Sequence, residues 1–232
     1  DTPGVLLGSA SSLRGASGGL LGGPWELSGV LGWSWRALGA RVVAVEPQPD
    51  FTRLLRLFFG RDDAVTVLPL ALGAAAGTAR LGVSRATPTV STLSQRWRDT
   101  VADDAGFSRV TWDSSIEVPV STLDALIAEH GVPAFCKIDV EGFEADVLDG
   151  LSRPLPALSV EYLPAAPDAT LESLARIEAL GRYVYRYSPV ETMTWDTSAG
   201  DRWVDAAELR SLLDRRRPLG RSGDVYARHV PA

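Results

Sequence analysis

Residues 134–151, "AFCKIDVEGFEADVLDGL", decide the fold of this chain. Residues 135–138 form an apolar run with a single charge in it, which predicts a buried strand. Asp139 follows the run directly, and Glu141-Gly142 predicts a turn. The residues after this turn predict a helix that ends at Gly150. A strand, a turn and a helix in this order are typical of an α/β protein.

The same alternation continues on both sides of this stretch. Apolar runs bounded by Gly, Pro or acidic residues predict strands, and spaced Leu and Phe residues predict helices. Because helices and apolar strands alternate with short connections, we expect a mainly parallel sheet covered on both faces. The expected strands are 41–45, 63–73, 77–84, 116–120, 134–138 and 157–162. The expected helices are 50–60, with Phe51, Leu54, Leu55, Leu57 and Phe58 on one face, 122–130 with Ser121 or Thr122 as its cap, and 143–150; residues 84–108 predict a loop with one short helix.

Composition limits the classes of function. The chain has 232 residues, 45% of them hydrophobic, which fits one large α/β domain. Its net charge is −6, so the basic surface of a nucleic-acid binder is not expected. No clean apolar run of about 20 residues predicts a membrane span. The single cysteine, Cys136, excludes an internal disulfide, so a reducing compartment and a cytoplasmic location are expected.

The first 34 residues differ from the rest of the chain. Gly, Ser and Leu dominate them, and neither helical nor alternating periodicity persists. We therefore expect residues 1–34 to form a separate segment and residues 35–232 to form the folded domain.

Three acidic residues follow or finish predicted strands. Glu46, Asp139 and Glu161 each end an apolar run. Open parallel sheets bind ligands at the carboxyl ends of their strands, so all three carboxylates could face one crevice. A carboxylate there can accept two hydrogen bonds from a ribose diol. Acidic residues after strands also serve as helix caps and turn formers, and that alternative stays open for each of them.

Four ordered blocks carry a resemblance to a known family. They are "VVAVEPQPDF", "PLALG", "STLDALIAEHGVPAFCKIDVEGFEADVLDGL" and "SVEYLP", spread over about residues 35–164. This pattern resembles the FkbM family of S-adenosylmethionine-dependent methyltransferases. The resemblance implies a Rossmann-like class I methyltransferase fold, with a mostly parallel seven-stranded sheet, a reversed last strand and helices on both faces. It also implies transfer of a methyl group to oxygen, often a hydroxyl of a sugar or polyketide.

The resemblance also implies roles for individual residues. Glu46, with the adjoining Pro47, would hold the cofactor ribose, while Leu70 and Ala71 would flank the adenine. Asp139 would lie beside the methionine moiety and the acceptor. The family opens its cofactor site with Asp-x-Gly-x-x-x-Gly, and the chain lacks that string. Its second glycine falls on Gly29, but Gly23 and Trp25 occupy the acidic and first glycine positions, so residues 1–34 would be a degenerate or altered cofactor loop.

Methyl transfer to an alcohol requires an aligned acceptor oxygen and removal of its proton. Asp139 is the first candidate for a base or a divalent-metal ligand, and Glu161 is the second. Glu141 is expected to shape the turn and help start the helix. The identity of any metal is left open. The tryptophans at 97, 112, 195 and 203 could line an acceptor pocket or belong to ordinary packing.

Three functions remain possible on these grounds. The first is an S-adenosylmethionine-dependent O-methyltransferase acting on a small-molecule hydroxyl, with neither nucleic acid nor membrane as a partner. The second is a non-catalytic or cofactor-impaired relative of the same fold that acts as a binding module. The third is a nucleotide-cofactor dehydrogenase, which the missing Gly-x-Gly-x-x-Gly turn disfavours. The sequence leaves the oligomeric state open.

Overall fold

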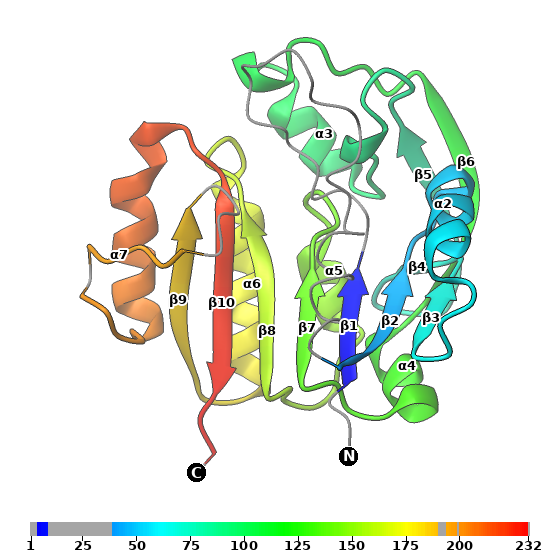
Figure 1. Ribbon diagram of the computed structural model, residues 1–232. Coiled ribbons are helices and arrows are strands. Elements are labelled where there is room, and N and C mark those ends of the chain that lie inside the picture. The colour runs from blue at the N-terminus through cyan, green and yellow to red at the C-terminus, as the bar shows by residue number, and fades with distance from the viewer. Residues whose placement is uncertain (1–3, 9–38, 190–193, 199, 232) are drawn as a thin grey trace.

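The structure, a computed structural model, describes residues 4–8, 39–189, 194–198 and 200–231. In residues 4–8 it describes the backbone, and from residue 39 onward it also describes the side chains. Its strands form two sheets (Figure 1). The large sheet has the order β3-β2-β1-β7-β8-β10-β9, and the small one has the order β4-β6-β5. The strands are β1 (Gly4–Gly8), β2 (Arg41–Val45), β3 (Val65–Leu68), β4 (Ala71–Leu72), β5 (Gly77–Val83), β6 (Ser114–Ser121), β7 (Phe135–Ile138), β8 (Ala157–Tyr162), β9 (Tyr183–Pro189) and β10 (Gly223–His229). The α-helices are α2 (Pro49–Phe59), α3 (Gln95–Val101), α4 (Leu123–His130), α5 (Glu144–Asp149), α6 (Pro167–Leu180) and α7 (Ala206–Arg216), and 3-10 turns span Pro88–Val90, Ala105–Phe107 and Arg217–Leu219.

The expected α/β fold is confirmed, but its sheets are mixed and there are two of them. Strands β3, β2, β1, β7 and β8 run parallel to one another. The last strand, β10, is antiparallel to both β8 and β9. One expected strand, 63–73, is divided at Pro69, which has no N–H for a ladder. Its first half is β3 in the large sheet, and its second half is β4 in the small sheet.

The main hydrophobic core lies on one face of the large sheet. The sequence "ALSVEY" of β8 alternates, so Leu158, Val160 and Tyr162 enter this core while Ser159 and Glu161 point to the opposite face. Helices α4, α5, α6 and α7 all contribute buried residues to the same core. The alternate residues of the central strands therefore point to the other face of the sheet, and polar residues gather there.

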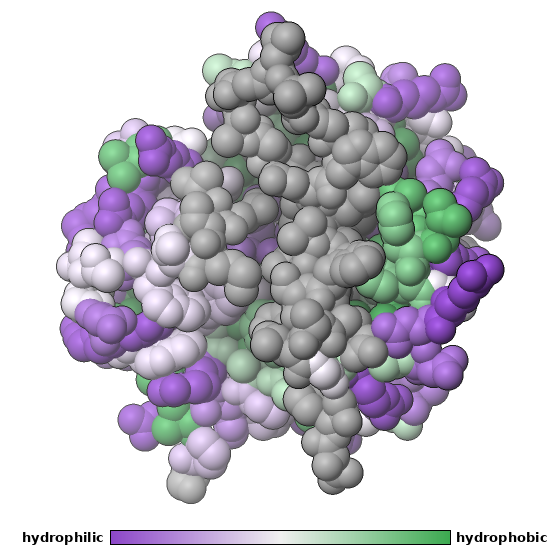
Figure 2. Space-filling model, viewed as in Figure 1, coloured by the Kyte–Doolittle hydropathy of each residue, from purple (hydrophilic) through white to green (hydrophobic). Residues whose placement is uncertain are grey.

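Helix α2 covers part of the opposite face. Leu55 and Phe59 pack on Ala44 of β2. The expected apolar face of this helix was partly wrong, because Leu57 is 78% exposed and Phe58 is 48% exposed. Figure 2 shows these hydrophobic side chains as a surface patch over α2.

Strand β1 lies in the segment to which the sequence pattern assigned no structure. It pairs in parallel with β2 on one side and with β7 on the other, so the sheet includes residues before position 35. The chain moves outward from β1 through β2 to β3 and later returns to β7. The gap between β1 and β7 is therefore the topological switch point, where open α/β sheets bind ligands.

The segment expected to be a loop with one short helix holds α3 between two 3-10 turns. Ser94 caps α3, since its hydroxyl accepts a hydrogen bond from the N–H of Trp97. Trp97 packs edge-on against Phe107 and Trp112. This small second core holds α3 above the carboxyl edge of the large sheet (Figure 1). Within the described residues, none of the helices combines the length and apolar character that crossing a membrane requires.

Candidate functional site

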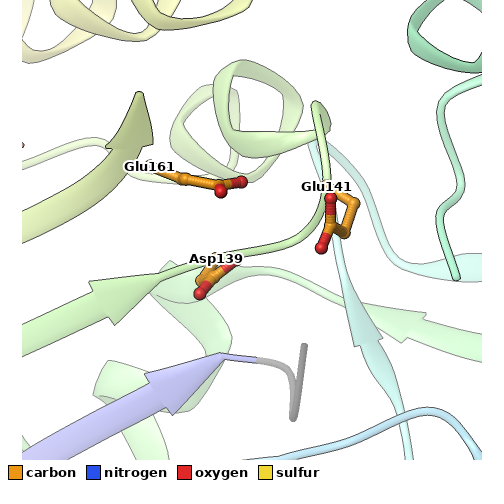
Figure 3. Close-up of side chains that lie close together, drawn as sticks. All are labelled: Asp139, Glu141 and Glu161. Atoms are coloured by element: carbon orange, nitrogen blue, oxygen red, sulfur yellow. The ribbon is translucent and has the colours of Figure 1, made fainter. Parts of the chain in front are cut away.

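Three carboxylates meet at the carboxyl edge of β7 and β8. The register pairs Ile138 with Val160, which sets Asp139 beside Glu161 at the ends of adjacent strands. Glu141 joins them from the turn after β7, and an oxygen of each carboxylate lies within 4.8 Å of the other two (Figure 3). All three side chains are buried. The structure thus brings together the two predicted catalytic residues and adds a third acidic residue.

The turn that carries Glu141 has an unusual backbone. Glu141 has φ of +54°, and it is the one described non-glycine residue with positive φ. Gly142 follows with φ of +79°, and a Cβ built there would lie 2.1 Å from Cδ1 of Trp97. Glycine is therefore required at position 142 by both conformation and space. A strained residue that carries a buried carboxylate at a sheet edge is a common feature of functional sites.

Glu144 organises this turn. Its Oε1 accepts hydrogen bonds from the N–H groups of Val140 and Gly142, at 3.0 and 3.2 Å. Glu144 therefore holds the turn in which Glu141 lies, and a role of Glu141 in starting the following helix remains a prediction. The pKa of Glu144 is raised to about 7, mainly by burial and to a lesser extent by the charge of Asp139, while backbone hydrogen bonds to its carboxylate act in the opposite direction.

A buried lysine, Lys137, forms ion pairs with Asp139 of the site and with Asp224. Lys137 is 6% exposed, and its Nζ lies 2.8 Å from Oδ1 of Asp224 on β10 and 3.3 Å from Oδ2 of Asp139. Burial raises the pKa of the Asp224 carboxyl, although the Lys137 ammonium favours its charged form. One ammonium group therefore bridges two buried carboxylates across three strands, and it fixes the orientation of Asp139.

Glu46 lies at the end of β2, as predicted, and is fully buried. Its Oε1 accepts a hydrogen bond from the N–H of Gln48 at 2.7 Å, which holds the Pro47 turn. Its backbone carbonyl accepts a hydrogen bond from the hydroxyl of Thr52 at 2.8 Å. The carboxylate after the strand therefore has a structural role in the turn, and a ribose-binding role remains a prediction.

An apolar pocket lies beside Glu46 and opens next to the turn after β7. Its lining includes Pro47 and Ala71, two of the predicted cofactor residues. Leu70 instead packs against the main core, and it is absent from the pocket lining. Gly29 lies outside the described residues. The other lining residues are Val45, Leu72, Leu81, Ser91, Thr92, Leu93, Val140 and Phe143.

A second and larger cavity, of about 440 Å³, lies between α3 and the first turns of α5 and α6. We call it the α3 cleft. It shares Leu93 and Phe143 with the apolar pocket, so the two cavities adjoin. Of the four tryptophans considered for an acceptor pocket, Trp97 lines this cleft. Trp112 packs behind Trp97, whereas Trp195 and Trp203 pack together beside Arg186 of β9.

The three carboxylates also have the donor chemistry of a cation site. Carboxylate oxygens are the ligands that Mg²⁺ and Mn²⁺ prefer. Among the described residues, Asp139, Glu141 and Glu161 are the one group of three or more His, Cys, Asp or Glu side chains close enough to share an ion. The residues present fit a divalent cation by donor type.

Sequence patterns missed several of these residues. Glu141 was assigned to the turn and to the start of the next helix, because a pattern does not show that its side chain folds back toward the strand ends. The Lys137–Asp224 pair joins residues 87 positions apart, so no local signal could have found it. The charge inside the apolar run of β7 was the only indication that one face of this strand is polar.

Comparison with known proteins gives a family. Residues 31–202 match the model of the methyltransferase FkbM domain. Among solved structures, the methyltransferase FkbM from Methylobacillus flagellatus KT has 16% identity and a TM-score of 0.46, over 97% of this chain and 43% of that one. A precorrin-6y C5,15-methyltransferase from Geobacter metallireducens GS-15 has 10% identity and a TM-score of 0.44, over 98% and 80% of the two chains.

This chain therefore spans less than half the length of the Methylobacillus protein. Curated proteins gave no match. The family model covers most of the chain, including β2, the carboxylate-bearing turn after β7, and β8. The chain belongs to the methyltransferase FkbM domain family.

Proposed function

We propose that this chain is an S-adenosylmethionine-dependent O-methyltransferase that acts on a hydroxyl group of a small molecule, such as a sugar or a polyketide-type natural product. One observation carries the proposal: Asp139, Glu141 and Glu161 form a buried carboxylate cluster at the switch-point edge, in a chain of a methyltransferase family. A cytoplasmic location, with neither nucleic acid nor membrane as a partner, completes the proposal.

The sheet order supports a class I methyltransferase fold. The large sheet has three strands on one side of the switch point and four on the other, and its last strand is reversed. Such a sheet binds its nucleotide cofactor across the carboxyl ends of the central strands. The cofactor would therefore extend over the ends of β1, β2 and β7.

The residues around the apolar pocket fit S-adenosylmethionine. Pro47, Ala71 and Phe143 give it apolar walls suited to a flat adenine ring. Glu46 lies in the chain between two of the lining residues, Val45 and Pro47, and its carboxylate would accept hydrogen bonds from ribose hydroxyls. When bound, S-adenosylmethionine supplies a methyl group already activated on a sulfonium.

The chain itself must orient the acceptor and take up its proton. Asp139 is the first candidate for the base, because Lys137 holds its carboxylate in place. Glu161, at the end of the neighbouring strand, is the second. This carboxylate would accept the proton of the hydroxyl whose oxygen takes the methyl group from the sulfonium sulfur. The same three carboxylates would bind the acceptor through a divalent cation if the reaction requires one.

Calorimetric titration with S-adenosylmethionine, and with its demethylated product, tests this proposal directly. Binding of both molecules supports a methyltransferase, and loss of activity with a chelator, restored by Mg²⁺, would assign the carboxylates to a cation. Absence of binding by a folded protein would contradict the proposal and favour a non-catalytic binding module. A preference for a nicotinamide cofactor in the same titration would favour a dehydrogenase.

A further inference from the structure

Helices α2 and α6 begin with the same four-residue pattern, Pro-Asp-x-Thr. Helix α2 starts with "PDFT", residues 49–52, and helix α6 starts with "PDAT", residues 167–170. Each helix follows a strand of the large sheet that has a glutamate at its carboxyl end, Glu46 directly after β2 and Glu161 in β8. Proline at the first position suits a helix start, because its missing N–H would have no partner there. The pattern therefore starts a helix after each of two strand-end glutamates.

The threonine of each pattern reaches back to the strand before its helix. The hydroxyl of Thr52 donates a hydrogen bond to the backbone carbonyl of Glu46 at 2.8 Å. The hydroxyl of Thr170 donates one to the backbone carbonyl of Glu161 at 3.0 Å, and both threonines are buried. Because side chains of a helix lean toward its N-terminus, a residue in the first turn can reach the end of the preceding strand. The two threonines thus make the same contact at two places on one sheet edge.

A third threonine makes this contact from a loop. Thr92 follows the 3-10 turn Pro88–Val90, and its buried hydroxyl donates a hydrogen bond to the backbone carbonyl of Glu141 at 2.8 Å. A buried hydrogen bond to a carbonyl limits the rotation of its peptide unit, so the residue that carries the carbonyl keeps its orientation. Three glutamates near the carboxyl edge are therefore held through their backbones, each by one threonine.

The backbone of Glu46 is held on both sides and lies next to the apolar pocket. Its N–H donates a hydrogen bond to the carbonyl of Leu68 on β3 at 3.0 Å, and its carbonyl accepts the hydrogen bond from Thr52. The residues before and after it in the chain, Val45 and Pro47, line the apolar pocket. A change in the orientation of this backbone should therefore affect a ligand bound in that pocket.

We propose that Thr52 is a positioning residue for S-adenosylmethionine: its hydroxyl keeps the Glu46 backbone in the orientation in which the carboxylate meets the cofactor ribose. This inference rests on the proposed methyltransferase function. Thr52 acts through Glu46, because the described lining of the apolar pocket does not include Thr52 itself. Loss of the hydroxyl alone should therefore weaken cofactor binding and leave the pocket walls unchanged.

Thr52→Val and Thr170→Val are a matched pair that tests the inference. Each variant replaces one buried hydroxyl by a methyl group of similar size, so both should lower the melting temperature by similar amounts. Among the described residues, neither Thr170 nor the chain neighbours of Glu161 line the apolar pocket. In titrations with the demethylated product of S-adenosylmethionine, Thr52→Val should bind about 5- to 10-fold more weakly, the scale of one hydrogen bond, and Thr170→Val within about 2-fold of the unchanged chain. Thr52→Ser keeps the hydroxyl and should restore the affinity.

Glu46→Gln tests whether Thr52 acts through the carboxylate. In that background, Thr52→Val should weaken binding by at most about 2-fold more, and a second full loss would overturn the inference. An unchanged affinity in Thr52→Val, or equal losses in both members of the matched pair, would also overturn it, although binding itself would still support the methyltransferase function. Absence of binding by the unchanged chain would contradict that function, and the inference with it. If circular dichroism shows that Thr52→Val is unfolded, Thr52→Ala and Thr170→Ala give the same comparison.

Discussion

At the scale of single residues, charge pairing controls the candidate site. Asp139, Glu141 and Glu161 lie together in a buried space, and such an arrangement needs nearby positive charge or hydrogen-bond donors. Lys137 supplies an ammonium from the same strand as Asp139, and Asp224 completes the pair from β10. The charge balance of the site therefore depends on Lys137, which lies within β7 and reaches Asp139 through its long side chain.

Asp139→Asn tests the proposed base. Asparagine keeps the size of the side chain and an oxygen acceptor but cannot take up the acceptor proton. We expect the methyl-transfer rate to fall by roughly 10²-fold or more, the scale of losing a general base. The measurement is single-turnover methylation of an identified acceptor, with cofactor affinity checked by titration. Activity within a few-fold of the original chain would move the base to Glu161.

Lys137→Met tests the buried ion pair. Methionine has a similar length but no charge, so Asp139 and Asp224 would stay buried without their shared ammonium. We expect the free energy of unfolding to fall by about 3 to 5 kcal/mol, the usual cost of removing one partner of a buried pair. Urea unfolding at neutral pH measures this change. Adding Asp224→Asn should recover part of the loss, and a purely additive double variant would refute the pairing.

At the scale of elements, sequence patterns predicted those strands and helices whose bounds are set by residues close to them in the chain. Strand β2 was found at its observed bounds, because an apolar run lies between Gly39 and the Glu46-Pro47 turn. The predicted end of the helix 122–130 is also the observed end of α4, and Gly131 follows it with φ of +87°. The two exposed apolar residues of α2, Leu57 and Phe58, show the limit of such patterns. Spacing shows that residues share a face, but only the tertiary fold decides how much of that face is covered.

Gly142→Ala tests the carboxylate-bearing turn. The substitution forces alanine into positive φ and drives its Cβ against Trp97. We expect a loss of stability of about 2 to 4 kcal/mol, from backbone strain and overpacking together. Gly131→Ala is the matched control, since Gly131 also has positive φ but no atom within 4 Å of its built Cβ. If both variants lose equal stability in urea unfolding, the contact with Trp97 contributes nothing.

Glu144→Gln tests the pH dependence of the same turn. The folded pKa of about 7 lies above the ordinary value of 4.5, so between these values the folded chain keeps a proton that the unfolded chain has lost. Stability should therefore decrease as pH rises from about 4.5 to 7, by about 3 kcal/mol from this group. Glutamine keeps the acceptor oxygen for Val140 and Gly142 and does not titrate. The difference between the two unfolding curves should follow this window, and a constant difference across it would contradict the assignment.

At the scale of the whole molecule, the order of strands in the large sheet brings distant residues to one edge. The adjacency of Asp139 and Glu161 could be predicted, because both follow from the rule that parallel strands end at the same edge. Strand β1 could not, since "GVLLG" is too short and too rich in glycine to differ from its surroundings. The small sheet was also missed, because β4 pairs with β6, which lies about 50 residues away and gives no local signal.

Ligand binding at the switch point should stabilise the entire fold. A ligand that binds only the folded chain, present at about 100 times its dissociation constant, adds about 2.7 kcal/mol. For a chain of this size, the demethylated cofactor should then raise the melting temperature by roughly 5 to 10 °C. In Glu46→Gln, which keeps an oxygen for the N–H of Gln48 but loses its charge, affinity should weaken by about 1.5 to 3 kcal/mol, and about half or more of this shift should disappear. Glu117→Gln, an exposed change on β6, should retain the shift. An equal rise in all three proteins would mean that Glu46 serves only its turn and that the ribose is held elsewhere.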